Sequence, residues 1–396
     1  MDKQEIELTA QNVIAIKNGR IATPIDIVSD GVILVKNSKI EAVGEKDKVT
    51  IPSDALAIDA RGRIVTPGFI DVHVHGGGGS DVMDGSYDAL NEMSTFEARH
   101  GTTGFLPTPY TDSQERLLAS VKAIETAMKR GTSGGEILGI HLEGPYINIE
   151  RKGGQPPEYI RKPDLEELRL LLEASNNNVK MITLAPEVNG GSEFVRRIIQ
   201  YGVVASIGHS NATYDEALRA VDAGVSHACH AYNAMREFHH REPGVVGAVL
   251  SCDELTAELI ADGIHVHPAA MKILVKCKGT DRIILVTDAV VGTGMEGRYK
   301  LGGRDVVITK KDSRFLDGAL AGSVLTMDSA VRNIMGLVGA SLQDAVKMAT
   351  VNPARRIGVY DRKGSLEAGK DADITIVDDQ INVYMTMVMG KIVYER

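Results

Sequence analysis

The chain contains no tryptophan, few other aromatic residues and only three cysteines among its 396 residues. Without clustered aromatic side chains, a platform for stacking nucleic-acid bases or polymer units is not expected. Cys229, Cys252 and Cys277 show no CxxC spacing, and an odd number of cysteines cannot pair completely. We therefore expect buried, unpaired cysteines in a protein of a reducing compartment, the cytoplasm.

The sequence also lacks an excess of positive charge and any long apolar run. Its net charge of −9 argues against nucleic acid as a partner, because phosphate neutralisation needs a basic stripe. No apolar run is long enough to span a bilayer, and residues 1–5 open no secretory signal, so no membrane partner is predicted. A small anionic ligand is still compatible with this negative net charge if a few basic residues lie together in one pocket.

The length suits a barrel of ordinary size with a smaller unit attached. Short β patterns occur near both ends of the chain, and each group is too small to form a stable sheet alone. These runs are 32–35, 39–43, 372–377, 384–388 and 392–394. We expect residues 1–66 and 356–396 to pair into one discontinuous β-sandwich domain, with residues 67–355 forming the catalytic domain.

Between the terminal segments, strand patterns alternate with helix patterns. In the helical stretch 112–130, Asp112 and Glu115 form a candidate capping box, and Gly131 follows as a stop. Further helices are predicted at 87–100, 164–175, 213–223 and 324–338, and an inserted hairpin at 298–317. Eight strands alternating with helices predict an α/β fold with a closed, TIM-like (β/α)8 barrel.

Nearly every one of the eight apolar runs ends in a group that can bind a metal or move a proton. Parallel barrel strands bring their C-terminal ends to one mouth, so these groups are expected to meet. His73 and His75 share one face of a strand, and Glu143, His209 and His230 follow other strands. Two histidines and a carboxylate are a ligand set of hydrolytic zinc sites. Each motif alone is also compatible with a purely structural role, as surface histidines or as a salt-bridged glutamate. Only the complete set of residues predicts a metal site.

Three further residues at the predicted mouth suggest proton transfer and anion binding. Asp288 ends the eighth run and can act as general base and then acid, although a lone aspartate there also suits a helix N-cap. Arg241 follows two histidines in a loop, and His265 ends the seventh run. Because arginine suits bidentate phosphate contact, Arg241 and His265 are predicted to bind an anionic substrate. Taken alone, the basic loop is equally typical of a solvated surface.

Eight short motifs lie along the chain: HVHGGGG at 73–79, HLEGP at 141–145, GHS at 208–210, HAYNAM at 230–235, HHREPG at 239–244, DGIH at 262–265, TDA at 287–289 and LAG at 320–322. Together they resemble the N-acetylglucosamine-6-phosphate deacetylase family of the amidohydrolase superfamily. The resemblance covers essentially the whole chain, whereas the HxH motif alone marks only the superfamily.

The resemblance implies a metal centre with one or two divalent ions, zinc or alternatively iron. Glu143, His209 and His230 would hold one ion, and His73 and His75 could help to hold a second one that Glu143 bridges. Among similar enzymes some lack the HxH pair and use a single ion, so the number of ions stays open here.

The resemblance also implies roles around the substrate. Asp288 would accept and donate the proton. Gln155 stands where some relatives carry histidine, which leaves polarisation of the carbonyl by an imidazole in doubt. The positions matching substrate contacts are Gly154, Asn233, Ala234, Arg241, His265, Leu320, Ala321 and Gly322. Similar enzymes hold the phosphate partly with groups from a neighbouring subunit, so a homodimer is implied.

The implied activity is removal of the N-acetyl group from N-acetylglucosamine 6-phosphate, giving glucosamine 6-phosphate and acetate, in amino-sugar catabolism. The nearest alternative is the same reaction on N-acetylgalactosamine 6-phosphate, since no sequence feature separates the epimers. Hydrolysis of a cyclic amide or a nucleobase is a second alternative, but such relatives often replace Glu143 and need no phosphate cluster. A metal-free scaffold protein is a third, and it should have lost ligands that this chain keeps.

Overall fold

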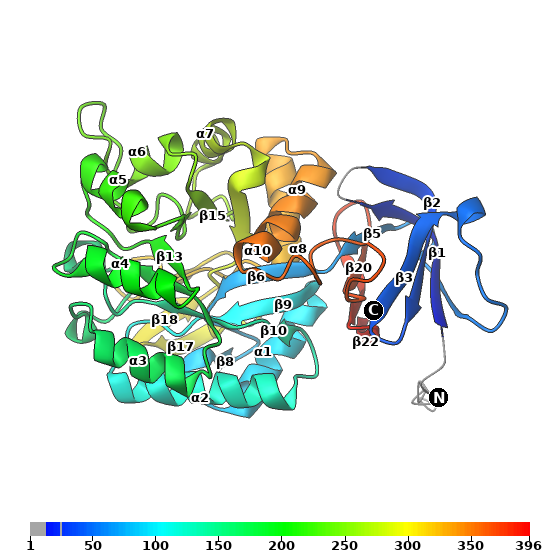
Figure 1. Ribbon diagram of the computed structural model, residues 1–396, viewed down its shortest axis with the longest axis horizontal. Coiled ribbons are helices and arrows are strands. Elements are labelled where there is room, and N and C mark those ends of the chain that lie inside the picture. The colour runs from blue at the N-terminus through cyan, green and yellow to red at the C-terminus, as the bar shows by residue number, and fades with distance from the viewer. Residues whose placement is uncertain (1–12, 24–25) are drawn as a thin grey trace.

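The structure is a computed structural model that describes residues 13–23 and 26–396, and it has two visibly distinct parts (Figure 1). Parallel strands and helices form the larger part. A mostly antiparallel sheet, built from the first and last strands of the described chain, lies beside it. The predicted mixed α/β class is confirmed. Within the described ranges, no helix is both long and apolar enough to cross a membrane.

Parallel strands form the buried interior of the larger part, in two sheets of orders β10-β9-β6 and β11 to β16. Isolated parallel bridges join Tyr110 to Glu143 and Val74 to Ala289, between the edges of the two sheets. Because successive strands run parallel, their C-terminal ends lie at the same edge. The strands are β6 (Phe69–Val74), β9 (Thr102–Pro107), β10 (Glu136–Ile137), β11 (Ile140–Glu143), β12 (Val179–Leu184), β13 (Val204–Ile207), β14 (His227–Ala228), β15 (Thr256–Ile260) and β16 (Ile283–Val286).

Amphipathic helices surround these strands. The helix α2 buries Leu117, Val121 and Ile124, as its helical period predicts. Its N-cap is Ser113, whose side chain accepts from the Arg116 backbone, so the predicted capping box of Asp112 and Glu115 is wrong. The helices are α1 (Tyr87–Arg99), α2 (Gln114–Arg130), α3 (Leu165–Ala174), α4 (Gly191–Gln200), α5 (Tyr214–Ala223), α6 (Gly244–Ser251), α7 (Pro268–Lys278), α8 (Met327–Asn333), α9 (Leu342–Ala349) and α10 (Val351–Arg356).

The smaller part is one sheet of order β22-β21-β20-β5-β1-β2-β3, with β4 paired to β1. Its central pairing joins β20 from the end of the chain to β5 from its beginning. The predicted hairpin at 32–43 is confirmed as the antiparallel pair β2 and β3. The strands are β1 (Val13–Ala22), β2 (Ile27–Lys36), β3 (Lys39–Glu45), β4 (Leu56–Asp59), β5 (Ile64–Pro67), β20 (Ile374–Val377), β21 (Val383–Val388) and β22 (Lys391–Glu395).

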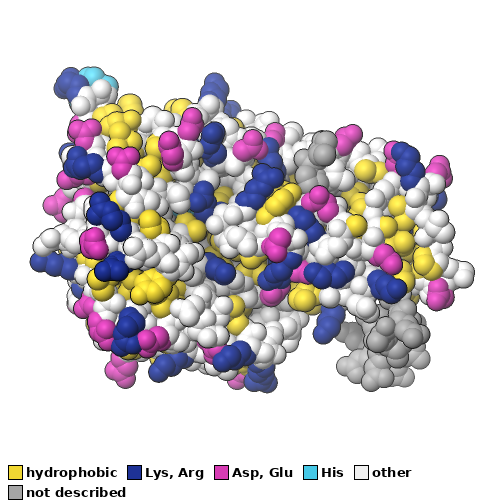
Figure 2. All heavy atoms as spheres, in the orientation of Figure 1, with side chains coloured by type: hydrophobic (Ala, Val, Ile, Leu, Met, Phe, Trp, Pro, Cys, Tyr) yellow, Lys and Arg dark blue, Asp and Glu magenta, His cyan; other side chains and the backbone are white. Residues whose placement is uncertain are grey.

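The predicted insertion at 298–317 is a three-stranded antiparallel sheet rather than a simple hairpin, formed by β17 (Gly297–Leu301), β18 (Arg304–Ile308) and β19 (Ser313–Phe315). A shorter pair, β7 (Gly76–Gly77) and β8 (Ser80–Asp81), follows β6. On the face drawn in Figure 2, basic and acidic side chains are interspersed, with no continuous basic stripe.

Candidate metal centre and substrate pocket

Three predicted ligands converge at the C-terminal ends of neighbouring strands. Glu143 is the last residue of β11, while His209 and His230 each lie two residues beyond the ends of β13 and β14. Glu143 Oε1 lies 3.0 Å from His209 Nε2 and 2.9 Å from His230 Nε2, and the two Nε2 atoms are 3.2 Å apart. All three side chains are buried. Groups from three separate strands therefore meet around one point.

A second group of predicted residues lies against the first. Nε2 of His73 lies 3.3 Å from Nε2 of His75, and Asp288 Oδ1 lies 3.1 Å from His75 Nε2. These three residues offer ligand atoms within 4.8 Å of one another. Glu143 faces this group as well, at 3.6 Å from His73 Nε2 and 3.5 Å from His75 Nε2. Oε1 of Glu143 thus lies near His209, His230 and His73, and Oε2 lies near His75.

Backbone strain accompanies this convergence. His209, His230 and Asp288 have φ values of 47°, 23° and 50°, a region that non-glycine residues rarely occupy. Such conformations persist where the surrounding structure over-determines them and cluster at functional sites. Here they turn the chain sharply at a strand end, which directs the side chain toward the shared point.

Hydrogen bonds fix the orientation of two of the imidazole rings. Nδ1 of His209 donates to the carbonyl oxygen of Arg151 (2.8 Å), and Nδ1 of His75 donates to that of Thr108 (2.7 Å). A carbonyl oxygen can only accept, so each Nδ1 carries a proton and each Nε2 is the ring atom that faces the centre and can bind an ion once it is deprotonated. Neutral imidazoles oriented in this way are the form that binds a metal ion.

The electrostatics of the cluster fit a cation. Burial alone would lower the pKa of His75 and of His230, but Asp288 and Glu143 raise both values to about 9. Despite its burial, Glu143 has a pKa well below its ordinary value because His209 and His230 surround it. Protons hold the positive charge that this cluster requires, and a divalent ion would replace them. The donor set of imidazole nitrogens and carboxylate oxygens suits zinc or iron.

Asp288 is placed to exchange a proton beside the centre. Its backbone NH donates to the His73 carbonyl oxygen (2.9 Å), which ties the end of β16 to the end of β6. Burial favours the neutral acid, yet contact with His75 and the charge of His73 lower the pKa of the carboxyl. At neutral pH Asp288 is therefore a carboxylate that can accept a proton.

A pocket of about 200 Å³ opens over the centre, and twelve of the fourteen predicted site residues line it. These are His75, Glu143, Gly154, His209, His230, Asn233, Ala234, His265, Asp288, Leu320, Ala321 and Gly322. His73 lies beneath the pocket, fully buried. Arg241 is the other exception: it lies exposed on the loop after β14, with Nη1 2.8 Å from His240 Nε2. Of the pocket-lining residues in the described chain, none is lysine or arginine.

Among the histidines that line the pocket, His265 is the one not assigned to the metal cluster. Its Nδ1 lies 2.6 Å from Asp262 Oδ2, and the Asp262 carboxylate also accepts from the backbone of Ile264 and His265. This local turn holds the ring in place. With Nδ1 committed to Asp262, Nε2 is the ring atom left to contact a ligand.

Sequence reasoning did not assign several residues that line the pocket. Gln155 Nε2 donates a short hydrogen bond to Glu143 Oε2, while its Oε1 accepts from the Thr111 backbone (2.9 Å). Tyr110 Oη accepts from the backbone of Gly302 in the inserted sheet (3.1 Å). In the sequence Gln155 stands out only as a departure from relatives, and no local pattern marks Tyr110 or Gly302 as pocket residues. Gly153, Pro156, Val290 and Leu301 complete the wall.

Comparisons with known proteins agree with this geometry. The amidohydrolase family model matches residues 64–393. The chain belongs to the amidohydrolase family. It is 37% identical over 384 residues to the N-acetylglucosamine-6-phosphate deacetylase of Bacillus subtilis (strain 168), covering 96% of each chain. It is also 40% identical over 343 residues to the N-acetylgalactosamine-6-phosphate deacetylase of Escherichia coli O157:H7, covering 86% of this chain and 90% of that one.

Solved structures give the same result. The N-acetylglucosamine-6-phosphate deacetylase of Pasteurella multocida superposes with a TM-score of 0.91 at 34% identity, covering 97% of this chain and 100% of that one. A mutant of the Mycobacterium smegmatis enzyme, solved in complex with N-acetyl-D-glucosamine-6-phosphate, superposes with a TM-score of 0.90 at 32% identity, covering 96% and 99%. The family resemblance inferred from the motifs is confirmed.

Proposed function

We propose that this protein hydrolyses the acetamide bond of N-acetylglucosamine 6-phosphate to release acetate and glucosamine 6-phosphate, a step of amino-sugar catabolism. The convergence of Glu143, His209, His230 and Asp288 in one pocket carries the proposal. The similarity of nearly the whole chain to deacetylases of this substrate class supports it.

The metal-binding part of the proposal assigns one divalent ion to Glu143, His209 and His230. A second ion would take His73 and His75, with Glu143 shared between the two. Zinc is the favoured ion and iron the alternative, since both accept imidazole and carboxylate ligands. When bound, the ion supplies Lewis-acid chemistry: it acidifies water and polarises a carbonyl group.

The protein's own groups supply proton transfer and orientation. The Asp288 carboxylate takes the proton of the attacking water and returns it to the amine as the C–N bond breaks, because an amide anion is too basic to leave unprotonated. Gln155 orients Glu143 through its amide hydrogen. Tyr110 and Leu301 narrow the pocket and exclude bulk water from the reacting centre.

The phosphate contact requires a second copy of the chain in this proposal. His265 lies in the pocket, whereas Arg241 lies on an exposed loop away from it. A phosphate needs more positive charge than His265 alone provides. In a homodimer, the loop carrying Arg241 would complete the pocket of the partner.

The galacto epimer is the second candidate substrate. The relative from Escherichia coli O157:H7 that bears the galactosamine name is as similar to this chain as several of the glucosamine enzymes. Comparing kcat/KM for the two 6-phosphorylated sugars, with acetate release as the readout, tests the proposal. Efficient release from the gluco sugar is expected. No acetate from either sugar, with the metal fully loaded, would refute the function.

We extend the proposal to the closure of the barrel, the pairing of the two terminal segments and the compartment in which the protein acts. Closure of the two parallel sheets into one (β/α)8 barrel is supported by the bridges at both of their edges. The proposed β-sandwich domain comprises 1–66, of which 1–12 and 24–25 lie outside the described residues, and 356–396, and 67–355 would be the catalytic domain. Ile40 of β3 and Met387 of β21, from opposite halves of the sheet order, share one apolar cluster, which supports this division. All three cysteines are unpaired, which supports a reducing, cytoplasmic setting, although Cys277 is exposed where a buried side chain was expected.

A further inference from the structure

A buried carboxylate lies beneath the candidate metal centre. Glu258 belongs to β15 and is fully buried. Its Oε2 lies 2.9 Å from His73 Nδ1 and accepts from the His230 backbone NH (3.0 Å), while its Oε1 lies 3.1 Å from His227 Nε2. One side chain thus contacts two of the proposed metal ligands, one from each group. Sequence reasoning had assigned no role to it.

The geometry fixes where the protons lie. Oε2 of Glu258 already accepts from the His230 backbone NH, so it is the acceptor oxygen of the carboxyl group. The ring nitrogen that lies beside this oxygen, Nδ1 of His73, therefore donates to it. The Nε2 of His73 is then a lone pair directed at Glu143 and Asp288. A carboxylate behind a ligating histidine is the arrangement that fixes the tautomer and raises the basicity of the ligand.

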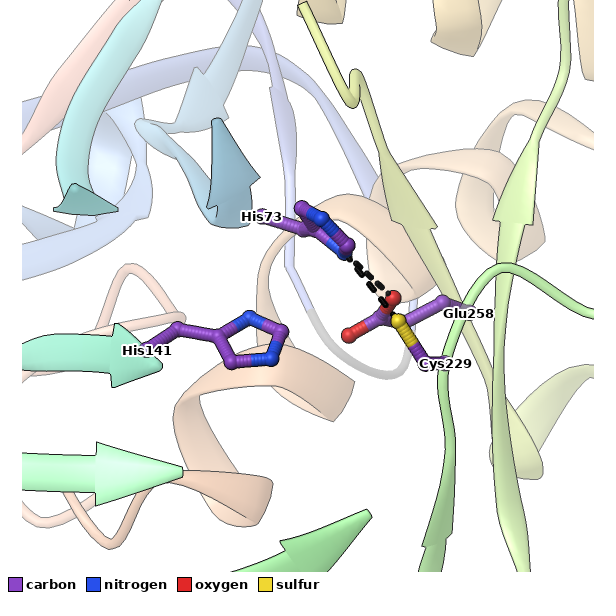
Figure 3. A group of neighbouring side chains, drawn as sticks. All are labelled: His73, His141, Cys229 and Glu258. Atoms are coloured by element: carbon purple, nitrogen blue, oxygen red, sulfur yellow. Dashed lines mark hydrogen bonds and ion pairs between the residues drawn. The ribbon is translucent and has the colours of Figure 1, made fainter. Parts of the chain in front are cut away.

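The same region offers an alternative interpretation as a separate metal site. His73, His141, Cys229 and Glu258 present ligand atoms within 4.8 Å of one another (Figure 3). However, His141 Nδ1 donates to the Val72 carbonyl oxygen (2.9 Å), and its Nε2 pairs with Thr183 Oγ1 (2.8 Å). Both nitrogens of His141 are already used.

The other three members of that cluster, His73, Cys229 and Glu258, fit a metal site no better. Figure 3 draws the interactions of His73 with Glu258 and Cys229, and none with His141. Cys229 Sγ lies 3.5 Å from His73 Nδ1, and that nitrogen already contacts Glu258 Oε2 at 2.9 Å. These contacts therefore favour a role of Glu258 in orienting the ligands of the candidate metal centre, and they do not favour a separate metal site in this cluster.

We propose that Glu258 is a positioning residue: it holds His73 in the Nδ1–H tautomer and fixes the backbone of His230, so that both Nε2 atoms face the metal. This inference rests on the proposed metal-binding function. Removing the carboxylate should weaken metal binding without removing any ligand.

The test compares metal affinity in three purified proteins, measured by competition with a zinc chelator. Glu258→Gln keeps the size of the side chain and removes its charge, and it should raise the zinc Kd by about 10- to 100-fold. Glu97→Gln is the matched control, because Glu97 is a buried carboxylate of α1 whose pKa burial raises to about 8. Its affinity should equal that of the wild type.

The possible results distinguish a failure of the inference about Glu258 from a failure of the proposed metal-dependent function. Unchanged zinc affinity in a folded Glu258→Gln variant would overturn the inference and leave the proposed function standing. Loss of one whole ion, with the affinity of the remaining ions unchanged, would assign Glu258 to a separate site and also overturn it. A wild-type protein that binds no divalent ion would remove the proposed function together with the inference.

A second measurement needs no Glu258 variant. In zinc-loaded wild-type protein with ¹⁵N-labelled histidine, His73 should carry its proton on Nδ1, with a far-downfield, slowly exchanging resonance that is missing in a His73→Gln protein. A proton on Nε2 of His73, with Nδ1 bare, would contradict the inference even if Glu258→Gln fails to fold.

Discussion

Asp288 Oδ1 lies 3.1 Å from His75 Nε2, so the carboxylate and the imidazole face each other across the candidate centre. The two residues come from the ends of β16 and β6, more than two hundred positions apart in the chain. The contact keeps Asp288 ionised and places it at the pocket wall. A proton acceptor in direct reach of the reacting atoms is what the proposed hydrolysis needs.

Asp288→Asn should lower kcat by about 100-fold or more, because an amide cannot accept the proton of the attacking water. Zinc content should stay near that of the wild type, since Glu143, His209 and His230 remain. Asp317→Asn, in an exposed turn of the inserted sheet, is the control and should leave turnover unchanged. Near-normal turnover in Asp288→Asn would overturn the proton-transfer assignment.

Metal affinity should rise with pH. In the metal-free protein His75 and His230 have pKa values raised to about 9, so both are protonated at neutral pH and must lose the proton to bind an ion. His230 belongs to the first proposed ion and His75 to the second, so each ion displaces one of these protons. The apparent affinity for each ion should therefore increase by up to about tenfold per pH unit between neutral pH and about 9, and then level off. Chelator competition across this range provides the measurement, and a flat profile would contradict the assigned ligands.

Arg241→Ala should raise KM for the phosphorylated sugar with a smaller effect on kcat. Co-expression with Asp288→Asn tests whether Arg241 acts across a dimer interface. In a two-fold dimer, half of the mixed molecules would be heterodimers with one intact site, restoring about a quarter of wild-type activity. No restoration in verified heterodimers would show that Arg241 acts within its own chain or not at all.

Gln155→Leu should reduce both zinc affinity and turnover, because Glu143 loses a donor and the Thr111 backbone loses an acceptor. Gln155→His restores a donor and should recover part of the loss. Steady-state rates and zinc titrations should rank the wild type first, Gln155→His second and Gln155→Leu last in both turnover and zinc affinity. If leucine performs as well as histidine, the amide of Gln155 has no orienting role.

Much of this site was predictable from the spacing of polar residues and from their places at the ends of apolar runs in the sequence. His73 and His75 are spaced for one strand face, and Glu143 and Asp288 end buried apolar runs. Parallel strands place such ends at one edge, so the ligands could be assembled without a structure. The pocket position of Gly154 followed from the family resemblance alone.

Other features depended on contacts that no local pattern encodes. Glu258 lies in the interior of an apolar strand, and its partners come from β6 and from the segment around β14. The positive φ of His209 is imposed by the fold and has no sequence signature. At α2, Ser113 displaced Asp112 as the cap because the helix begins one residue later than the pattern indicated.

The most direct test of the account is activity measured through metal removal and return. Exhaustive chelation should abolish acetate release from N-acetylglucosamine 6-phosphate, and adding zinc or ferrous iron should restore it in the wild type but not in a folded His209→Ala variant. Full activity of wild-type protein in which no divalent metal is detectable would contradict the central claim.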